Sequence, residues 1–103
     1  MPEDRDREFL IIVCESGTCN EVLRRIQAAG VDRYTIQRGA TGCGETGRHE
    51  GTPVWPGDCT MIYSCVHQVQ VGPVLETLTA LHSSRQQHTL GLKVFSLPAR
   101  ELL

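Results

Sequence analysis

The stretch that most constrains the fold is Gly39–Gly57, a long connection between two segments with strand-like patterns. It contains six of the chain's ten glycines, two of its five prolines and its only tryptophan. Tyr34–Arg38 before it alternates weakly, and Asp58–Val66 after it is rich in β-forming residues. Two strands joined without a helix are most simply antiparallel neighbours. Because such long connections are uncommon in small domains and are often functional, we predict a flexible sensing loop over residues 39–57.

The segment before this loop carries the patterns of one strand and one helix. Glu8–Cys14 is a short, continuous apolar run rich in β-branched residues, which predicts a buried strand. Thr18 followed by Glu21 fits a capping box at the start of a helix that ends near Gly30. The apolar residues of this helix recur at helical spacing, and they are Val22, Leu23, Ile26 and Ala29.

The segment after the loop predicts a second helix and a last strand. The helix has Pro73 in its first turn, where proline is tolerated, and ends near Ser83–Arg85. Leu92–Leu97 is the last strand, which we expect Pro98 to stop. The order βαββαβ predicts the α+β class, with a ferredoxin-like four-stranded antiparallel sheet and two helices on one face. The apolar positions of the second helix are Val71, Val74, Leu75, Leu78 and Leu81.

The second face of this sheet has no predicted cover. A bare and partly apolar face on a small domain predicts an interaction surface. Self-assembly is the first candidate and RNA the second, because RNA-recognition modules share this strand order and carry exposed aromatic residues on their central strands. Only Phe9 and Tyr63 fill that role here, without a basic–aromatic motif. The residues expected on this face include Phe9, Ile11, Ile62 and Phe95.

Length and charge narrow the possible functions. A chain of 103 residues suits a single domain, and we expect residues 1–7 to form a polar, flexible tail. No apolar run is long enough to span a bilayer and the charged start is no signal peptide, so we expect a cytoplasmic protein without membrane insertion. The net charge of −2 argues against nucleic-acid binding by charge alone. Nine arginines accompany the single lysine, Lys93, and arginine suits a bidentate grip on phosphate or carboxylate.

The five cysteines include no Cys-x-x-Cys pair. Cys14 and Cys65 fall in predicted strands, and we expect both to be buried and inert. Cys43 and Cys59 lie at the two ends of the loop, where a disulfide would form a redox pair that limits the loop's excursions; two reduced thiols are the alternative in a reducing compartment. The histidines lack the spacing of a metal site. The sequence shows no pattern that combines a nucleophile, a general base and a residue to orient that base, so we expect no enzymatic activity.

Three motifs resemble those of the PII-type signalling proteins, and the resemblance in topology covers most of the chain. Gly30-Val31-x-x-Tyr34-Thr35 is similar to the turn into the family's second strand. Gly42-Cys43-Gly44 is similar to the glycine-rich start of its long loop, the T-loop. Gly91-x-Lys93-x-Phe95 is similar to the end of its phosphate-binding loop and the strand that follows.

Some segments depart from this pattern. Residues 84–89 replace the glycine-rich run of the phosphate loop, and Arg100 is the one nearby candidate for the family's paired C-terminal arginines. Residues 47–57 are more similar to the loops of divergent PII-like proteins associated with carboxysomes and inorganic-carbon transport. The resemblance implies a homotrimer with adenine nucleotides in the clefts between subunits and a response to bicarbonate. It also implies a protein target, such as a bicarbonate transporter or a carboxysome component, and therefore an association with carboxysomes.

The resemblance also implies which residues bind these ligands. A glycine-rich turn brings backbone N–H groups close to an anion because no Cβ blocks the approach, while Lys93 adds a point charge and arginines add planar forks. The pattern alone fits Lys93 equally well as a solvated strand lysine, and Arg48 and His49 as solvated loop residues. The implied nucleotide-binding residues are Thr35, Arg38, Gly42, Gly44, His88, Gly91, Lys93 and Arg100, and those for bicarbonate are Cys43, Gly47 and Arg48.

These implications set the expected ligand order. Because the full phosphate loop is lost, we expect a weak γ-phosphate site, so that ADP and AMP bind at least as well as ATP. Bicarbonate held by Arg48 and backbone amides would order the loop when nucleotide is also bound. The alternative function is a small metal-binding or redox-sensing trimer of the same fold, which would use the cysteines and histidines.

Overall fold

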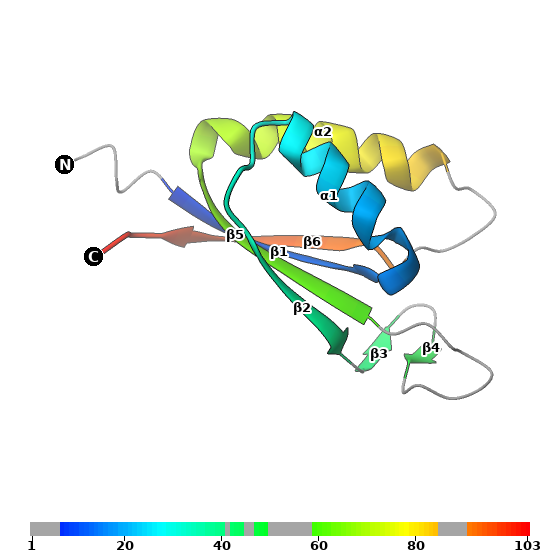
Figure 1. The fold of residues 1–103 in the computed structure, drawn as a ribbon. Coiled ribbons are helices and arrows are strands. Elements are labelled where there is room, and N and C mark those ends of the chain that lie inside the picture. The colour runs from blue at the N-terminus through cyan, green and yellow to red at the C-terminus, as the bar shows by residue number, and fades with distance from the viewer. Residues whose placement is uncertain (1–6, 41, 45–46, 50–58, 85–90) are drawn as a thin grey trace.

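The computed structural model describes residues 7–40, 42–44, 47–49, 59–84 and 91–103, with residues 40, 42–44 and 47–49 described by their backbone alone. Four strands form an antiparallel sheet in the order β2-β5-β1-β6, and both helices lie on the same side of it (Figure 1). This is the predicted ferredoxin-like arrangement. The elements are β1 (Arg7–Glu15), a 3-10 turn (Ser16–Thr18), α1 (Cys19–Ala28), β2 (Thr35–Ala40), β3 (Gly42–Gly44), β4 (Gly47–His49), β5 (Cys59–His67), α2 (Gln68–Ser84) and β6 (Lys93–Ala99).

The core lies between the helices and one face of the sheet. Alternate residues of β1 and β5 point into it, as the period-2 geometry of a strand requires. Apolar residues of α1 and α2 at helical spacing cover them. The largest fully buried side chains of the described residues come from all four of these elements: Leu10, Ile12, Val22, Ile26, Ile62, Val74, Leu78 and Leu81.

The start of α1 differs from the predicted capping box. Thr18 is the N-cap, but its hydroxyl donates a hydrogen bond to the carbonyl oxygen of Glu15, at 2.9 Å, instead of accepting one from the first turn. The 3-10 turn leads directly into the helix, so the backbone of Thr18 is not in the extended conformation that a capping residue usually adopts. Glu21 forms ion pairs with Arg24 and Arg25 instead of capping the helix.

Two proline positions also differ from prediction. Pro98 lies inside β6 and does not stop it, because β6 is an edge strand and can include a residue without an N–H donor. The helix α2 begins at Gln68, so Pro73 lies in its second turn instead of its first.

Within the predicted loop, β3 and β4 pair as a small antiparallel hairpin, which the sequence pattern did not reveal.

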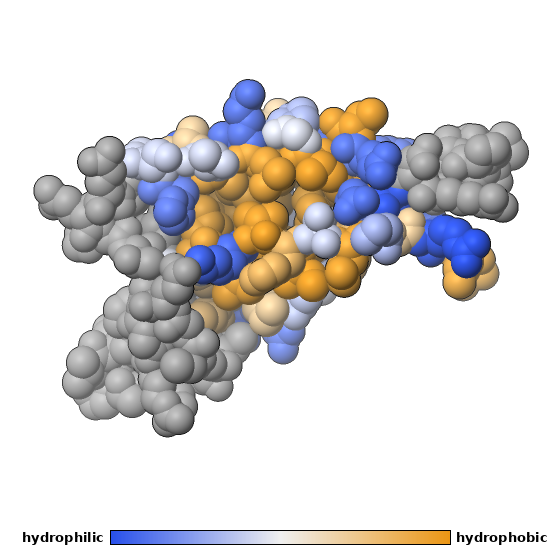
Figure 2. All heavy atoms as spheres, turned by 180° about the vertical axis from the view of Figure 1, so that it is seen from behind, coloured by the Kyte–Doolittle hydropathy of each residue, from blue (hydrophilic) through white to orange (hydrophobic). Residues whose placement is uncertain are grey.

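The outer face of the sheet carries a set of apolar side chains. Phe9 and Tyr63 stack with their ring centroids 6.1 Å apart, and Phe95 and Leu97 on the edge strand are 55% and 54% exposed. Ile62, expected on this face, is instead in the core, because it pairs with the buried Ile12. Seen from behind the view of Figure 1, apolar side chains gather across the middle of the molecule (Figure 2). We call the outward-pointing residues Phe9, Ile11, Val13, Met61, Tyr63, Phe95 and Leu97 the open face.

Cys14 and Cys65 lie on opposite faces of the sheet. Cys14 is fully buried, as predicted, whereas Cys65 is exposed, because the alternation of β5 turns it to the outer face. Burial raises the pKa of the Cys14 thiol from 9.0 to about 12, with a further increase from nearby Cys19. The neutral thiol is therefore the form that the core stabilises.

The raised pKa of Cys14 predicts a loss of stability at high pH. A thiol with a raised folded-state pKa contributes stability that is complete below pH 9 and is lost as the pH rises toward 12. By pH 11 we expect this one group to reduce the free energy of unfolding by about 3 kcal/mol. Urea unfolding at pH 8 and pH 11 measures the loss. The Cys14→Val variant, of similar volume, should lose less between the two pH values, and an equal loss in both proteins would contradict the prediction.

Candidate functional site

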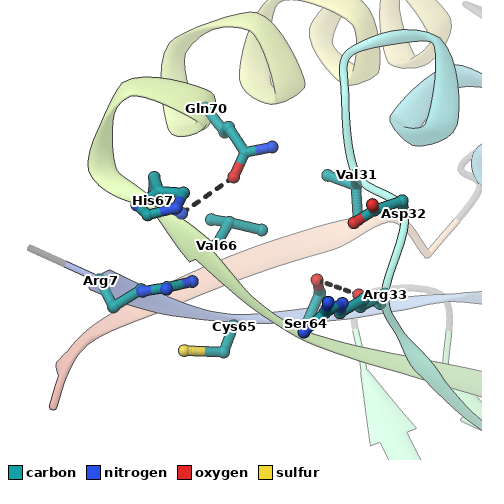
Figure 3. Close-up of a pocket in the computed structure, with 9 residues that line it drawn as sticks. All are labelled: Arg7, Val31, Asp32, Arg33, Ser64, Cys65, Val66, His67 and Gln70. Atoms are coloured by element: carbon teal, nitrogen blue, oxygen red, sulfur yellow. Dashed lines mark hydrogen bonds between the residues drawn. The ribbon is translucent and has the colours of Figure 1, made fainter. Parts of the chain in front are cut away.

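A pocket of about 330 Å³ lies beside the end of β5, where that strand no longer has β2 as a neighbour. The β2–β5 ladder begins with Thr35 opposite Tyr63, so the connection Val31–Tyr34 does not pair with the remainder of β5. Volumes of this size are typical of small-molecule sites. We call this hollow the β5-end pocket. It is lined by Arg7, Val31, Asp32, Arg33, Ser64, Cys65, Val66, His67 and Gln70 (Figure 3).

Hydrogen bonds fix the backbone frame of the β5-end pocket. The Gln70 side-chain amide donates to the carbonyl oxygen of Gly30 at 2.8 Å and accepts from the backbone N–H of His67 at 2.9 Å. The Ser64 hydroxyl donates to the carbonyl oxygen of Arg33 at 2.6 Å. Gly30 has a φ of 105°, a conformation that favours glycine. The connection between α1 and β2 is therefore tied both to α2 and to β5.

Charged side chains of both signs line the β5-end pocket. Arg7 and Asp32 approach its middle from opposite sides (Figure 3). A terminal nitrogen of Arg7 lies 3.5 Å from a carboxylate oxygen of Glu101, in the segment after β6. Among the described residues, neither the Asp32 carboxylate nor the Arg33 guanidinium has an ion-pair or hydrogen-bond partner. The pocket therefore offers cationic donors and a carboxylate acceptor to the same ligand.

A second group of candidate residues lies at the other end of the sheet, beside the β3–β4 hairpin (Figure 1). Gly39 and Gly91 adopt left-handed φ values of 75° and 63° there, which explains why glycine stands at both positions. Arg38 is on the edge strand β2, and Lys93 is on the opposite edge strand β6. Three strand spacings separate these edges, about 14 Å in total. Lys93 also borders a mostly apolar hollow of about 250 Å³ between α2 and β6.

The structure divides the predicted nucleotide-binding residues into two groups. Arg100 lies toward the β5-end pocket, since it follows Ala99, the partner of Arg7. Thr35 lies between the two groups, opposite Tyr63 in β5. His88 lies outside the described residues. The remaining residues lie at the hairpin end: Arg38, Gly42, Gly44, Gly91 and Lys93.

These two groups are too far apart to form one pocket in a single chain. Lys93 lies in the row of Val13 and Met61, whereas the pocket lies in the row of Arg7 and His67, six residues farther along the strands. Six residues of strand span about 20 Å. A ligand that contacts both groups must therefore lie between two copies of the chain.

The predicted bicarbonate residues come together in the backbone of one hairpin. Cys43 pairs with Arg48, and Gly47 pairs with Gly44 at the turn. Cys59 instead pairs with Glu15 in β1 and with Ala40 in β2. The ladders therefore do not place Cys43 opposite Cys59, and the redox pair stays a prediction. In the part of the chain that the structure describes, no three His, Cys, Asp or Glu residues are grouped as a metal site.

Sequence patterns missed most of the β5-end pocket. Arg7 falls within the predicted flexible tail, residues 1–7, and the spacing of the histidines gives no reason to select His67. No motif marked Asp32, Arg33 or Gln70, because these residues converge only through the ending of the β2–β5 ladder at Tyr63. The one available signal was the predicted turn from Gly30 to Thr35, which set where β2 begins.

Comparisons with known proteins agree with this geometry. The model of the family "Nitrogen regulatory protein P-II" matches residues 7–102. No curated protein matches the sequence at a significant level. None of the described helices is long and apolar enough to cross a membrane.

Solved structures with the same fold include CPII, a nitrogen regulatory PII-like protein from Thiomonas intermedia K12. One CPII structure, bound to ADP, AMP and bicarbonate, is 26% identical, with a TM-score of 0.68 over 87% of this chain and 88% of that chain. Another, bound to ADP and bicarbonate, is 25% identical, with a TM-score of 0.70 over 92% and 89%. Arabidopsis thaliana PII bound to citrate shares the fold at 18% identity, with a TM-score of 0.65 over 92% and 78%.

Proposed function

Because the chain belongs to the nitrogen regulatory P-II family, we propose that it is a PII-like regulatory protein that binds adenine nucleotides in clefts between the subunits of a homotrimer. The observation that carries this proposal is the division of the candidate residues between two distant ends of the sheet. In a ring of subunits, one chain contributes its β5-end pocket and its neighbour contributes the hairpin end. PII proteins are typically trimers, and the similar protein CPII is bound to ADP and AMP.

The open face supports the homotrimer. Its apolar side chains on β1, β5 and β6 are only partly buried within one chain. Contiguous apolar surface of this kind is usually covered by a partner. A second and third copy of this chain would bury the open face at the centre of the ring and leave the helices outside.

ADP and AMP are the nucleotides that we expect to bind best. Residues 84–89 lack the glycine-rich run that binds phosphates in the family. Its loss is expected to weaken the γ-phosphate site more than the α- and β-phosphate sites. Isothermal titration calorimetry with ADP, AMP and ATP is expected to give affinities for ADP and AMP at least equal to that for ATP. A tenfold preference for ATP would overturn this order.

Bicarbonate is the proposed second ligand, and the β3–β4 hairpin is its proposed site. Cys43 and Arg48 are directly paired in this hairpin, beside Gly47, and the similar protein CPII is bound to bicarbonate together with ADP. Arginine and backbone N–H groups suit a small planar anion. Binding there would order the loop and so couple the two ligands.

This coupling predicts that bicarbonate strengthens ADP binding. We expect a 5-fold or larger gain in ADP affinity at saturating bicarbonate, within the usual range of coupling energies. Titration of ADP with and without bicarbonate at constant pH and ionic strength measures it, with chloride as the control anion. The Arg48→Gln variant should lose the gain while keeping its basal ADP affinity. Equal ADP affinities with bicarbonate and chloride would refute the coupling.

The role that follows is signalling in inorganic-carbon metabolism. The loop between β2 and β5 would present or withdraw a docking segment according to the bound ligands, and a bicarbonate transporter or a carboxysome component is the proposed target. Binding of a candidate target to the full chain with ADP, with bicarbonate and with both tests this role. A target whose affinity is the same in all three states would contradict it. No observation favours the metal-binding or redox-sensing alternative over this function.

A further inference from the structure

The ion pair between Arg7 and Glu101 joins the β5-end pocket to the C-terminal segment. Arg7 is the first residue of β1, and its side chain points toward the middle of the pocket with 20% of its surface exposed (Figure 3). The β1–β6 ladder pairs Arg7 with Ala99, which brings the chain after β6 beside the pocket. Glu101 then places a carboxylate oxygen 3.5 Å from the guanidinium, with 51% of the glutamate side chain exposed.

Arg33 supplies a second guanidinium to the same pocket from a different element. Its carbonyl oxygen is held by the Ser64 hydroxyl at 2.6 Å, so its backbone is fixed, while its side chain is exposed and has no ion-pair or hydrogen-bond partner among the described residues. Two guanidiniums that line one hollow form a ready site for a phosphate, which accepts bidentate hydrogen bonds from arginine.

We infer that the Glu101 carboxylate competes with the phosphate of a bound nucleotide for the Arg7 guanidinium. When the phosphate binds Arg7, the ion pair with Glu101 breaks and the chain that follows Ala99 is released. This inference rests on the proposed nucleotide binding. An exposed ion pair is weak, whereas a phosphate between two guanidiniums gains charge-assisted hydrogen bonds from both. The competition is reciprocal, since a tail held on Arg7 weakens phosphate binding to the same extent that phosphate weakens the tail contact.

The consequence is that only the phosphate of the nucleotide, and not its nucleoside part, breaks the ion pair between Arg7 and Glu101. Adenosine can occupy the hollow and contact Asp32 without disturbing Glu101, because it carries no phosphate. AMP adds the group that competes for Arg7. Leu102 and Leu103 are 85% and 112% exposed and would move with the released segment.

Calorimetry of the full chain with AMP and adenosine tests the competition. In the Glu101→Gln variant we expect AMP affinity to rise by about 2- to 5-fold, the amount set by an exposed ion pair, with adenosine affinity unchanged. In the Arg33→Gln variant we expect AMP affinity to fall by about 10-fold or more, and adenosine affinity to fall by much less. The matched control is Arg24→Gln, an arginine on the surface of α1 away from the pocket. Equal changes for AMP and adenosine, or no change in Glu101→Gln, would overturn the inference.

Two further measurements separate this inference from the proposed function. Tryptic cleavage after Arg100, followed by mass spectrometry, should be faster with AMP than with adenosine in the wild-type chain, and equally fast with both in Glu101→Gln. Inorganic pyrophosphate is the second probe. If it binds with the same dependence on Glu101 and Arg33 while AMP does not bind, the competition stands and the nucleotide function fails. If AMP binds and Glu101→Gln leaves both its affinity and the digestion rate unchanged, the function stands and the competition fails.

Discussion

Replacing Phe95 with aspartate is expected to convert the proposed homotrimer into a folded monomer that lacks the proposed ADP binding. Phe95 is 55% exposed within one chain, belongs to the open face and pairs with Ile11 of the central strand β1. In the proposed trimer its ring is buried against neighbouring copies, so an aspartate there would bury an unpaired carboxylate in each subunit. That burial costs roughly 3–5 kcal/mol per copy, which opposes assembly. ADP binding should disappear with the trimer, because each cleft needs two chains.

Light scattering coupled to size-exclusion chromatography over a range of concentrations gives the oligomeric state, and circular dichroism shows whether the fold is retained. The matched control is Leu75→Asp, which places the same charge on an exposed leucine of α2, on the helical side of the molecule. This control should remain a trimer and bind ADP. A trimeric Phe95→Asp protein would show that another surface holds the subunits together.

The sequence was sufficient to predict the four main strands and two helices, because each of these elements has a local sequence pattern that tertiary contacts do not override. These patterns are a continuous apolar run in β1, a set of β-forming residues in β5 and helical spacing of apolar residues in α2. Predictions failed where a tertiary contact decides the outcome. Pro98 is allowed in β6 only because this strand is at an edge, and Thr18 bonds back to Glu15 because a 3-10 turn precedes α1.

The candidate site was only half predictable for the same reason. Gly91 and Lys93 carry a family motif, so the sequence identified them, and the left-handed φ of Gly91 gives one physical reason for its glycine. Apart from Val31, the residues of the β5-end pocket belong to no such motif. Arg7, Arg33 and Gln70 are far apart in the chain and meet only because β2 begins late and leaves the end of β5 without a neighbour on that side.

The division of the site between two ends of the sheet leads to a sharp test, because two defective variants should restore each other. Lys93→Glu changes the hairpin end, and Arg33→Glu changes the β5-end pocket, toward the opposite edge of the sheet. Each charge reversal opposes a phosphate directly. We therefore expect each variant alone to form trimers that fail to bind ADP at concentrations that saturate the wild-type protein.

Mixed trimers of these two variants should bind ADP, although neither parent does. A cleft is intact when its hairpin end comes from an Arg33→Glu chain and its pocket end comes from a Lys93→Glu chain. Random assortment at equal amounts gives this combination in about one quarter of clefts. Unfolding the variants together in urea, refolding the mixture and titrating ADP measures the fraction, with each variant refolded alone as the control. Because a site contained in one chain remains defective in every mixture, the absence of recovery in verified mixed trimers would show that the two ends do not hold the same nucleotide.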